Sequence, residues 1–404
     1  TLSNVVATQF QQTGLEFAAG FSDWETFFSF IVSQAKGKPF LLILDELPYL
    51  LEAVRGFGTL LQKVWDHELQ GTQVKLVLSG SYVSAMRRLT TADQPLHGRK
   101  TGSLSFSPYS YRDAAEFCPA YSARDRLIAF ATFGGLPGQL SLIDPSRDIA
   151  DNIAQQMLNP SGRLADEAQH LFDSFLRDAG VHYSIVRAIA NGEQKWSKIT
   201  NRVGKDSASL SRPLDWLQDM DVITRVIPIT ETPPGNPKKT IYRLSDPYLA
   251  FWHRFVAMIR ASGSDDLMTS RELWDHFVAP GLDEYMGPMF EFVCRDFVGR
   301  SKHPRLPFHP VRVGEWWSDD SKEQIDVVAL GPEGQVLLGE CKWGSVNADD
   351  VDRLNARRET VLKEIKRVTQ VHMAVFAGNA IGDRRLKSLI SKDEVLRFSL
   401  EDLF

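Results

Sequence analysis

A short, continuously apolar segment that ends in two carboxylates is the feature that most constrains the fold of this chain. Phe40–Leu44 is entirely apolar, and Asp45 and Glu46 follow it directly. A run this short is typical of a strand in a parallel sheet that is covered on both faces. A second such segment, Val74–Leu78, follows a helical pattern at 57–67. Strand, helix and strand at this spacing predict a βαβ unit, and therefore an α/β fold with a parallel sheet.

The composition limits the class of protein. The chain has 404 residues, 43% hydrophobic and 24% charged, which suits about two to four globular domains. The net charge is −5, so any contact with nucleic acid needs a local basic face. Three cysteines without a CxxC pair argue against a disulfide framework or a zinc knuckle and fit a reducing compartment. Because no apolar run reaches about 18 residues, we expect a cytoplasmic protein without a membrane span.

The carboxylates after the first strand suggest phosphate chemistry with a divalent cation. A buried strand fixes the position of its own carboxyl end, where Asp45 would orient Mg²⁺ and Glu46 would polarise an attacking water. Ser79 follows the neighbouring strand, where a polar side chain would sense a γ-phosphate, and Arg99 could reach a phosphate from later in the chain. Acidic residues also end many strands only to cap the next helix, and this alternative stays open.

The middle of the chain changes to three helical patterns followed by two short strands. We expect helices at 181–190, 197–203 and 209–220, and strands at 222–229 and 240–244. This order predicts a winged helix, whose third helix enters the major groove of DNA. The residues expected to contact DNA form a local basic and polar face: Lys198, Lys205, Ser209, Ser211, Arg212 and, on the wing, Lys238 and Lys239.

Two points qualify this interpretation of the middle region. A winged helix can instead serve as a protein-docking module or a lid, and this alternative stays open. Pro213 lacks an N–H group and is tolerated in the first turn of a helix, so we expect the third helix to place it there.

A third group of charged residues lies on a predicted hairpin near the C-terminus. We expect its strands at 323–330 and 335–343, with Asp326 on the first strand. Glu340 and Lys342 lie two residues apart on the second strand, so their side chains share one face. Across the turn, Asp326 can reach the same end of the hairpin.

These residue types suit metal-dependent chemistry on phosphates. The two carboxylates of Asp326 and Glu340 could hold a hard cation such as Mg²⁺ or Mn²⁺. Lys342 could then stabilise a developing phosphate charge or orient water. Glu291, on a helix expected at 282–298, could complete the site. The alternative is a solvated hairpin with a cross-strand ion pair that contributes under about 1 kcal/mol.

Several segments together resemble one ATPase family. The archaeal-type AAA+ ATPases, which are P-loop proteins related to the STAND ATPases, have similar segments in the same order as residues 41–49, 76–81, 98–99, 133–138 and 242–255. In that family the ATPase core precedes a winged helix and a C-terminal domain of unknown function related to restriction-type nucleases. The resemblance covers nearly the whole chain. It implies that Asp45 and Glu46 are the Walker B pair and that Ser79 is the sensor residue.

The C-terminal hairpin resembles the PD-(D/E)XK nuclease fold. In that fold an Asp precedes a strand with the pattern Glu-X-Lys, after a helix that bears a Glu. The expected order of helix, strand, strand, helix and strand also matches its core. The resemblance implies that Asp326 and Glu340 are metal ligands and that Lys342 and Glu291 act in catalysis. Since sites on shared folds are readily lost, a nuclease fold without activity stays open.

The sequence departs from the AAA+ pattern at the phosphate-binding loop. No GxxxxGK[ST] segment occurs, and Gly204-Lys205 is followed by Asp206 within the predicted winged helix. The backbone cradle and lysine of that loop make most of the favourable phosphate contacts. The loop would precede Leu15, and the chain starts at Thr1 rather than at a methionine. Either the chain is trimmed or its nucleotide site is inactive. We expect that this chain does not bind ATP and that a longer form with the loop does.

These patterns predict five regions. They are an AAA+ ATPase core without Walker A at 1–140, a helical lid or linker at 141–180, a winged helix-turn-helix at 181–246, a helical connector at 247–280 and a nuclease-like α/β domain at 281–404. The predicted function is a DNA-associated ATPase in DNA processing or defence. The expected cofactors are ATP with Mg²⁺ in the ATPase core and Mg²⁺ or Mn²⁺ in the nuclease-like domain. The alternative is a DNA-binding or scaffold ATPase switch with an inactive nuclease fold, and self-association into a homo-oligomer is open.

Overall fold

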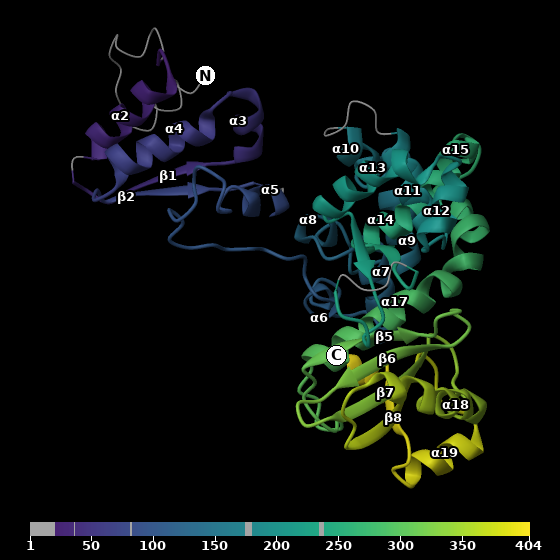
Figure 1. Cartoon of the computed structure of the whole chain (residues 1–404). Helices are drawn as coiled ribbons and strands as arrows, with labels where there is room; N and C mark the ends of the chain where they lie inside the picture. The colour runs from purple at the N-terminus through teal and green to yellow at the C-terminus, as the bar shows by residue number, and fades with distance from the viewer. Residues whose placement is uncertain (1–20, 36, 81–82, 174–179, 234–237) are drawn as a thin grey trace. The chain divides into compact units, whose positions relative to one another are not determined.

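The chain forms two compact units, Thr1–Phe106 and Ser107–Phe404. The computed structural model describes residues 21–35, 37–80, 83–173, 180–233 and 238–404 (Figure 1). The boundary between the units lies before the limit at residue 140 that we predicted for the ATPase core. The reason is that α6 (Tyr111–Ala115) and α7 (Ala123–Phe133) pack into the core of the second unit.

The described part of the N-terminal unit contains a two-stranded sheet and helices on it. Its elements are α2 (Trp24–Ala35), β1 (Phe40–Leu44), α3 (Leu47–Ala53), α4 (Phe57–Val64), the π-helical turn η2 (Trp65–Leu69), β2 (Val74–Leu78) and α5 (Val83–Arg88). The two strands are parallel and in register from Phe40 opposite Val74 to Leu44 opposite Leu78. The predicted βαβ unit is therefore confirmed for these strands.

The parallel sheet of this unit is covered on one face, where Phe28 and Leu61 join its core. The alternate residues Leu41 and Ile43 are 57% and 55% exposed, and Val77 on β2 is exposed beside them. The prediction that the first strand is covered on both faces is wrong for the described residues, because no helix among them packs on this second face.

The helical part of the second unit runs from Ser107 to Arg300. After α6 and α7, its elements are α8 (Pro137–Leu140), α9 (Ile149–Ile153), η3 (Ala154–Leu158), α10 (Glu167–Asp173), α11 (Gly180–Ala190), α12 (Trp196–Val203), α13 (Ser207–Asp219), β3 (Ile223–Val226), β4 (Ile241–Leu244), α14 (Pro247–Phe251), η4 (Trp252–Val256), α15 (Ala257–Ser262), η5 (Ser264–Asp266), α16 (Ser270–Leu273), η6 (Trp274–Val278) and α17 (Ala279–Arg300).

The three helices α11–α13 and the hairpin β3–β4 follow the predicted order. Strands β3 and β4 are antiparallel, and Lys195, just before α12, forms a further bridge with Ile241 on β4. Pro213 corrects one expectation, because it lies in the seventh position of α13 rather than in the first turn. The carbonyl of Ser209 is thereby left without its helical N–H partner. Since Ser209 is exposed, water can satisfy that carbonyl.

The C-terminal part is a five-stranded sheet flanked by helices. Its elements are β5 (Arg312–Trp317), β6 (Gln324–Leu330), β7 (Gln335–Lys342), α18 (Ala348–Glu364), β8 (Gln370–Ala377), α19 (Arg384–Ser391), β9 (Leu396–Ser399) and η7 (Glu401–Leu403). The strands lie in sequence order, with β5, β6 and β7 antiparallel and β7, β8 and β9 parallel. The predicted hairpin, helices and third strand are present, while strands β5 and β9 were not predicted.

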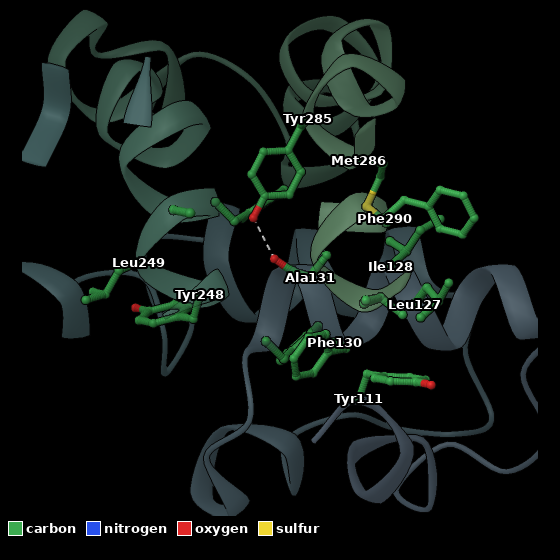
Figure 2. Close-up of a cluster of buried hydrophobic side chains, with 14 of the residues drawn as sticks. Tyr111, Leu127, Ile128, Phe130, Ala131, Tyr248, Leu249, Tyr285, Met286 and Phe290 are labelled. Carbon is green, nitrogen blue, oxygen red and sulfur yellow. Dashed lines mark hydrogen bonds between the residues drawn. The ribbon is translucent and has the colours of Figure 1, made fainter. Parts of the chain in front are cut away.

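Helix α17 joins the two parts of this unit. Its first half packs against α7 and α14, where the hydroxyl of Tyr285 donates a hydrogen bond of 2.6 Å to the carbonyl of Ala131 (Figure 2). Its second half, with Cys294 and Phe297, packs on one face of the C-terminal sheet against Phe376. Helix α18 covers the opposite face through a separate core. The position of the hairpin β6–β7 is therefore fixed from both sides.

None of the helices formed by the described residues combines the length and the apolarity needed to cross a bilayer.

Candidate functional site

The hairpin β6–β7 brings the predicted carboxylates and lysine to one end of the C-terminal sheet. Val327 pairs with Gly339, so extending the antiparallel register by one residue places Asp326 opposite Glu340. Directly opposite residues point to the same face, and Lys342 shares that face because it lies two residues beyond Glu340. Asp326 is 7% and Glu340 is 4% exposed. The structure thus gathers three of the predicted site residues, of which Asp326 and Glu340 are buried and Lys342 has a side chain that is 41% exposed.

Glu340 lies between two cationic side chains. Its Oε1 is 2.7 Å from Nζ of Lys342, and its Oε2 is 3.6 Å from a guanidinium nitrogen of Arg357 on α18. The Oε2 atom is buried and accepts no hydrogen bond. Burial alone would lower the pKa of Lys342, but Glu340 outweighs it and raises that pKa above its ordinary value. Lys342 is therefore held in its charged form.

Asp326 is an unusually basic carboxylate. Its Oδ2 accepts a hydrogen bond of 2.9 Å from the backbone N–H of Cys341. Burial, together with the charges of Glu291 and Glu340, raises the pKa of Asp326 to about 7. Burial also raises the pKa of Glu291, against the opposing charges of Arg295 and Arg243. Arg295 lies 3.7 Å from Glu291 and donates to the backbone carbonyl of Asp326 at 2.8 Å, so Glu291 lies beside the hairpin.

A fourth carboxylate, Glu315 on β5, was missed by the sequence analysis. It lies at a β-bulge between Gly314 and Trp316, and it is 3% exposed. Both terminal nitrogens of the Arg243 guanidinium donate to its carboxylate, one of them at 2.7 Å to Oε2. Burial alone would raise the pKa of Glu315, but Arg295 and Arg243 outweigh it and hold that pKa below its ordinary value. We call Glu291, Glu315, Asp326 and Glu340 the acidic cluster.

Little in the sequence could have revealed Glu315 and Arg243 as partners. The segment Arg312–Trp317 does not alternate between apolar and polar residues, and the bulge breaks the period of two further. Arg243 lies 72 residues earlier in the chain, on strand β4. The one available signal is the aromatic pair Trp316-Trp317, which directly follows Glu315 in the sequence.

At the carboxyl ends of β1 and β2 the predicted acidic pair meets the predicted sensor residue. The hydroxyl of Ser79 donates to Oδ1 of Asp45, and the backbone N–H of Glu46 donates to the same oxygen at 3.1 Å. Glu46 adopts a left-handed conformation with φ of 50°, which is uncommon outside glycine, and it makes no side-chain cap on α3. The alternative from the sequence was that these acidic residues cap the following helix, and the side chain of Glu46 does not do so.

Arg99 lies in a different contact from the one predicted. Its guanidinium pairs with Asp66 at 2.7 and 2.8 Å and donates to the backbone carbonyls of Pro95 and His97. All of these hydrogen-bond partners of the Arg99 guanidinium lie within the N-terminal unit. The structure therefore joins Arg99 to η2 and not to Asp45, which corrects the expectation that it approaches a bound phosphate.

Five of the residues predicted to contact DNA are exposed on α12, on α13 or in the turn between them. They are Lys198, Lys205, Ser209, Ser211 and Arg212. The serine hydroxyls also serve their own helix, because Ser209 donates to the carbonyl of Asp206 at 2.9 Å and Ser211 donates to that of Ser207 at 2.8 Å. The lysines and Arg212 are the stronger candidates for phosphate contacts.

Lys239 corrects the prediction for the wing. Its side chain is 7% exposed and lies 2.7 Å from Asp319, 3.5 Å from Glu231 and 3.9 Å from Glu364. Its backbone carbonyl accepts a hydrogen bond from the Trp317 indole at 3.1 Å. Lys239 is thus an internal counter-ion and not a phosphate contact, whereas the adjacent Lys238 is exposed.

Across the part of the chain that the structure describes, no group of three or more His, Cys, Asp or Glu side chains has an arrangement that could hold a metal ion. Any cation at the hairpin would therefore rest on Asp326 and Glu340, with other oxygens from the backbone or from water.

A family of "Archaea bacterial proteins of unknown function" (DUF234) matches residues 252–354 of this chain. The matched region contains all four carboxylates of the acidic cluster together with Arg295 and Lys342. Arg243 lies outside it.

Two curated relatives are uncharacterized proteins of Methanocaldococcus jannaschii. One is 27% identical over 336 residues, which are 82% of this chain and 72% of the relative. The other is 35% identical over 54 residues, or 13% of this chain and 52% of the relative. Among solved structures, a Walker-type ATPase of Pyrococcus abyssi matches 62% of this chain and 75% of its own chain, at 21% identity and a TM-score of 0.43.

The raised pKa of Asp326 predicts how the stability of the metal-free protein depends on pH. The folded carboxyl keeps its proton up to a pH of about 7, whereas the unfolded one ionises near 3.8. The folded state therefore binds more protons in this window, and the free energy of unfolding falls as the pH rises through it. Asp326→Asn cannot ionise, so its stability relative to wild type should increase between pH 5 and pH 8 by on the order of 2 kcal/mol.

Urea unfolding in the presence of a chelator measures this difference. The control is Asp349→Asn, which changes an exposed carboxyl on α18 and should leave the difference from wild type constant with pH. If the Asp326→Asn curve runs parallel to that of wild type, Asp326 is not an abnormally basic carboxyl.

Proposed function

We propose that residues 281–404 hydrolyse phosphodiester bonds of nucleic acid with the help of a divalent cation. One observation carries this proposal: Asp326, Glu340 and Lys342 share one face and one end of a buried hairpin, beside Glu291 of the preceding helix. The order of helix, three antiparallel strands, helix and parallel strand around this hairpin supports a PD-(D/E)XK nuclease-like domain.

The donor set suits a hard cation. Asp326 and Glu340 provide carboxylate oxygens, and the buried Oε2 of Glu340 has no hydrogen-bond donor of its own. These are the oxygen ligands that Mg²⁺ and Mn²⁺ prefer. A cation held there would polarise a phosphodiester and lower the pKa of a bound water.

The remaining residues of the cluster act on the substrate and on protons. Lys342 keeps its charge because of Glu340, so its Nζ can stabilise the negative charge that develops on a phosphate oxygen. Burial raises the pKa of Glu291, so its carboxyl holds a proton more readily than an ordinary glutamate and can release it to the leaving group.

Cleavage of plasmid, linear and branched DNA with Mg²⁺ or Mn²⁺ tests this activity. Asp326→Ala and Lys342→Ala should each lower the rate by at least about a hundredfold, because each removes charge stabilisation from a low-dielectric site. Glu394→Ala, which changes an exposed carboxyl far along the chain in the turn before β9, is the matched control and should retain the wild-type rate. Equal cleavage by wild type and both site variants would mean that a contaminating nuclease is responsible.

We further propose that residues 180–246 form a winged helix that binds DNA for this domain. The order α11, α12, α13, β3, β4 supports this, as does the bridge that Lys195 adds to the hairpin. The exposed cations Lys198, Lys205 and Arg212 give a basic face to a chain whose net charge is −5.

The double variant Lys205→Ala/Arg212→Ala should weaken duplex binding and reduce the slope of log affinity against log salt by about 2, because each removed cation would otherwise neutralise one phosphate. Fluorescence anisotropy over a salt series measures both quantities. The pair Lys302→Ala/Lys392→Ala makes the same change in net charge at exposed sites in the C-terminal part, and it should leave the slope unchanged. An unaltered slope in the first variant would reject this face.

A second candidate function is a nucleotide switch or scaffold of the AAA+ type whose nuclease fold is inactive. The contact of Asp45 with Ser79 at the carboxyl ends of two parallel strands favours it, since a Walker B carboxylate and a sensor residue would meet there. A GxxxxGK[ST] loop is absent from the 404 residues, so the acidic half of such a site has no phosphate cradle in this sequence.

We therefore expect the 404-residue chain to show no tight binding of ATP. Isothermal titration with Mg²⁺·ATP should give a Kd weaker than about 1 mM, since isolated carboxylates repel the phosphates. The same titration of Asp45→Asn, which lacks the carboxylate charge, is the control. Binding in the micromolar range that disappears in Asp45→Asn would show a nucleotide site without the loop.

A further inference from the structure

The hairpin β3–β4 and the segment after β3 are attached to strand β5 of the C-terminal sheet. The backbone N–H of Ile229 donates to the carbonyl of Glu315 at 2.8 Å, and Arg312 donates to the carbonyl of Ile229 at 2.7 Å. The Ile229 side chain belongs to the same buried core as Trp316 and Ile325. This attachment holds β4 beside the acidic cluster.

Arg243 on β4 enters the cluster directly. Its guanidinium forms a bidentate ion pair with Glu315. The negative charges of Glu291 and Asp326 also raise the pKa of Arg243, against the effect of burial. A second guanidinium, that of Arg295, lies 3.7 Å from Glu291 and 3.9 Å from Glu315. Arg243 is therefore part of the electrostatic environment of the hairpin carboxylates, although it belongs to the region with the basic helices.

When all four carboxylates are ionised, as at a pH above that of about 7 at which Asp326 loses its proton, the charges of the cluster are balanced. The four carboxylates are then matched by Arg243, Arg295, Lys342 and Arg357, and Arg243 alone among these cations lies outside residues 281–404. In a buried site an added dication gains little attraction from a neutral cluster. Removal of one guanidinium leaves a net negative charge, which in a low dielectric attracts a cation strongly.

We propose that Arg243 is an internal competitor of the divalent cation, which keeps the acidic cluster from binding metal until β4 moves. This inference rests on the proposed role of Asp326 and Glu340 as cation ligands. Strand β4 is tied to the basic helices, because Tyr242 donates its N–H to Gln194 at 2.8 Å and Ile241 bridges to Lys195 before α12. Nucleic acid that binds α12 and α13 thereby acts on the segment that carries Arg243, so the two binding events are linked.

Binding of Mn²⁺ alone, measured by the loss of the free-ion electron paramagnetic resonance signal, tests the competition without substrate. Arg243→Met keeps an unbranched apolar stem but removes the charged guanidinium, and it should raise the affinity for Mn²⁺ at least about tenfold over wild type. Arg225→Met is the matched control on the same hairpin, since that guanidinium bonds the Thr240 hydroxyl at 3.2 Å, and it should bind Mn²⁺ like wild type. Adding Asp326→Asn to Arg243→Met should abolish the gain.

Loss of Arg243 also leaves Glu315 buried without its strongest partner, which can prevent folding. Arg243→Lys retains a positive charge for Glu315 but does not keep the two-pronged geometry, so it should give an intermediate gain in Mn²⁺ affinity. Folded Arg243→Met or Arg243→Lys proteins with wild-type Mn²⁺ affinity would overturn the inference. A gain in Mn²⁺ affinity without any DNA cleavage would support the competition and instead reject the proposed nuclease activity.

Discussion

The burial of three carboxylates, those of Glu315, Asp326 and Glu340, beside the half-buried Glu291 is the constraint on which the C-terminal half of this protein depends. Buried charges are costly unless opposite charges and hydrogen-bond donors accompany them. Here the required cations come from four elements: α17 provides Arg295, β7 provides Lys342, α18 provides Arg357 and β4 provides Arg243. The need to satisfy Glu315 therefore attaches the three-helix region to the sheet at one defined position.

This attachment connects the three-helix region of the second unit to its C-terminal sheet. Helix α17 carries Tyr285 into the helical core and Phe297 onto the sheet, so the two parts share one hydrophobic core. The exposed Lys198 of α12 and the half-buried Arg243 of β4 then belong to one compact region, with one face toward solvent and the other toward the acidic cluster. The exposed basic face and the buried acidic site within one unit are the two features on which the proposed link between nucleic-acid binding and metal binding rests.

Local patterns predicted much of the fold and part of the site. The apolar segment at β1, the helical periods of α11–α13 and the hairpin β6–β7 depend on neighbours close in sequence, and they appear with shifts of a few residues at most. The gathering of Asp326, Glu340 and Lys342 follows from the alternation of side chains along two adjacent strands, which a hairpin turn makes predictable. Arg99 and Lys239 were misplaced because both have charged partners from distant segments: Asp66, and Asp319 with Glu364.

Residue types and their spacing along single elements were therefore enough to predict an α/β chain with a parallel strand pair and a charged C-terminal hairpin. The exposure of Leu41 and Ile43 on β1 among the described residues, the bulged strand β5 and the bond between Arg243 and Glu315 depended on which segments pack together. The physical reason is the distance along the chain over which each interaction acts. Backbone periodicity and turn geometry act over a few residues. Buried charges are costly without a partner, so their pairing depends on which distant segments pack together in the folded chain.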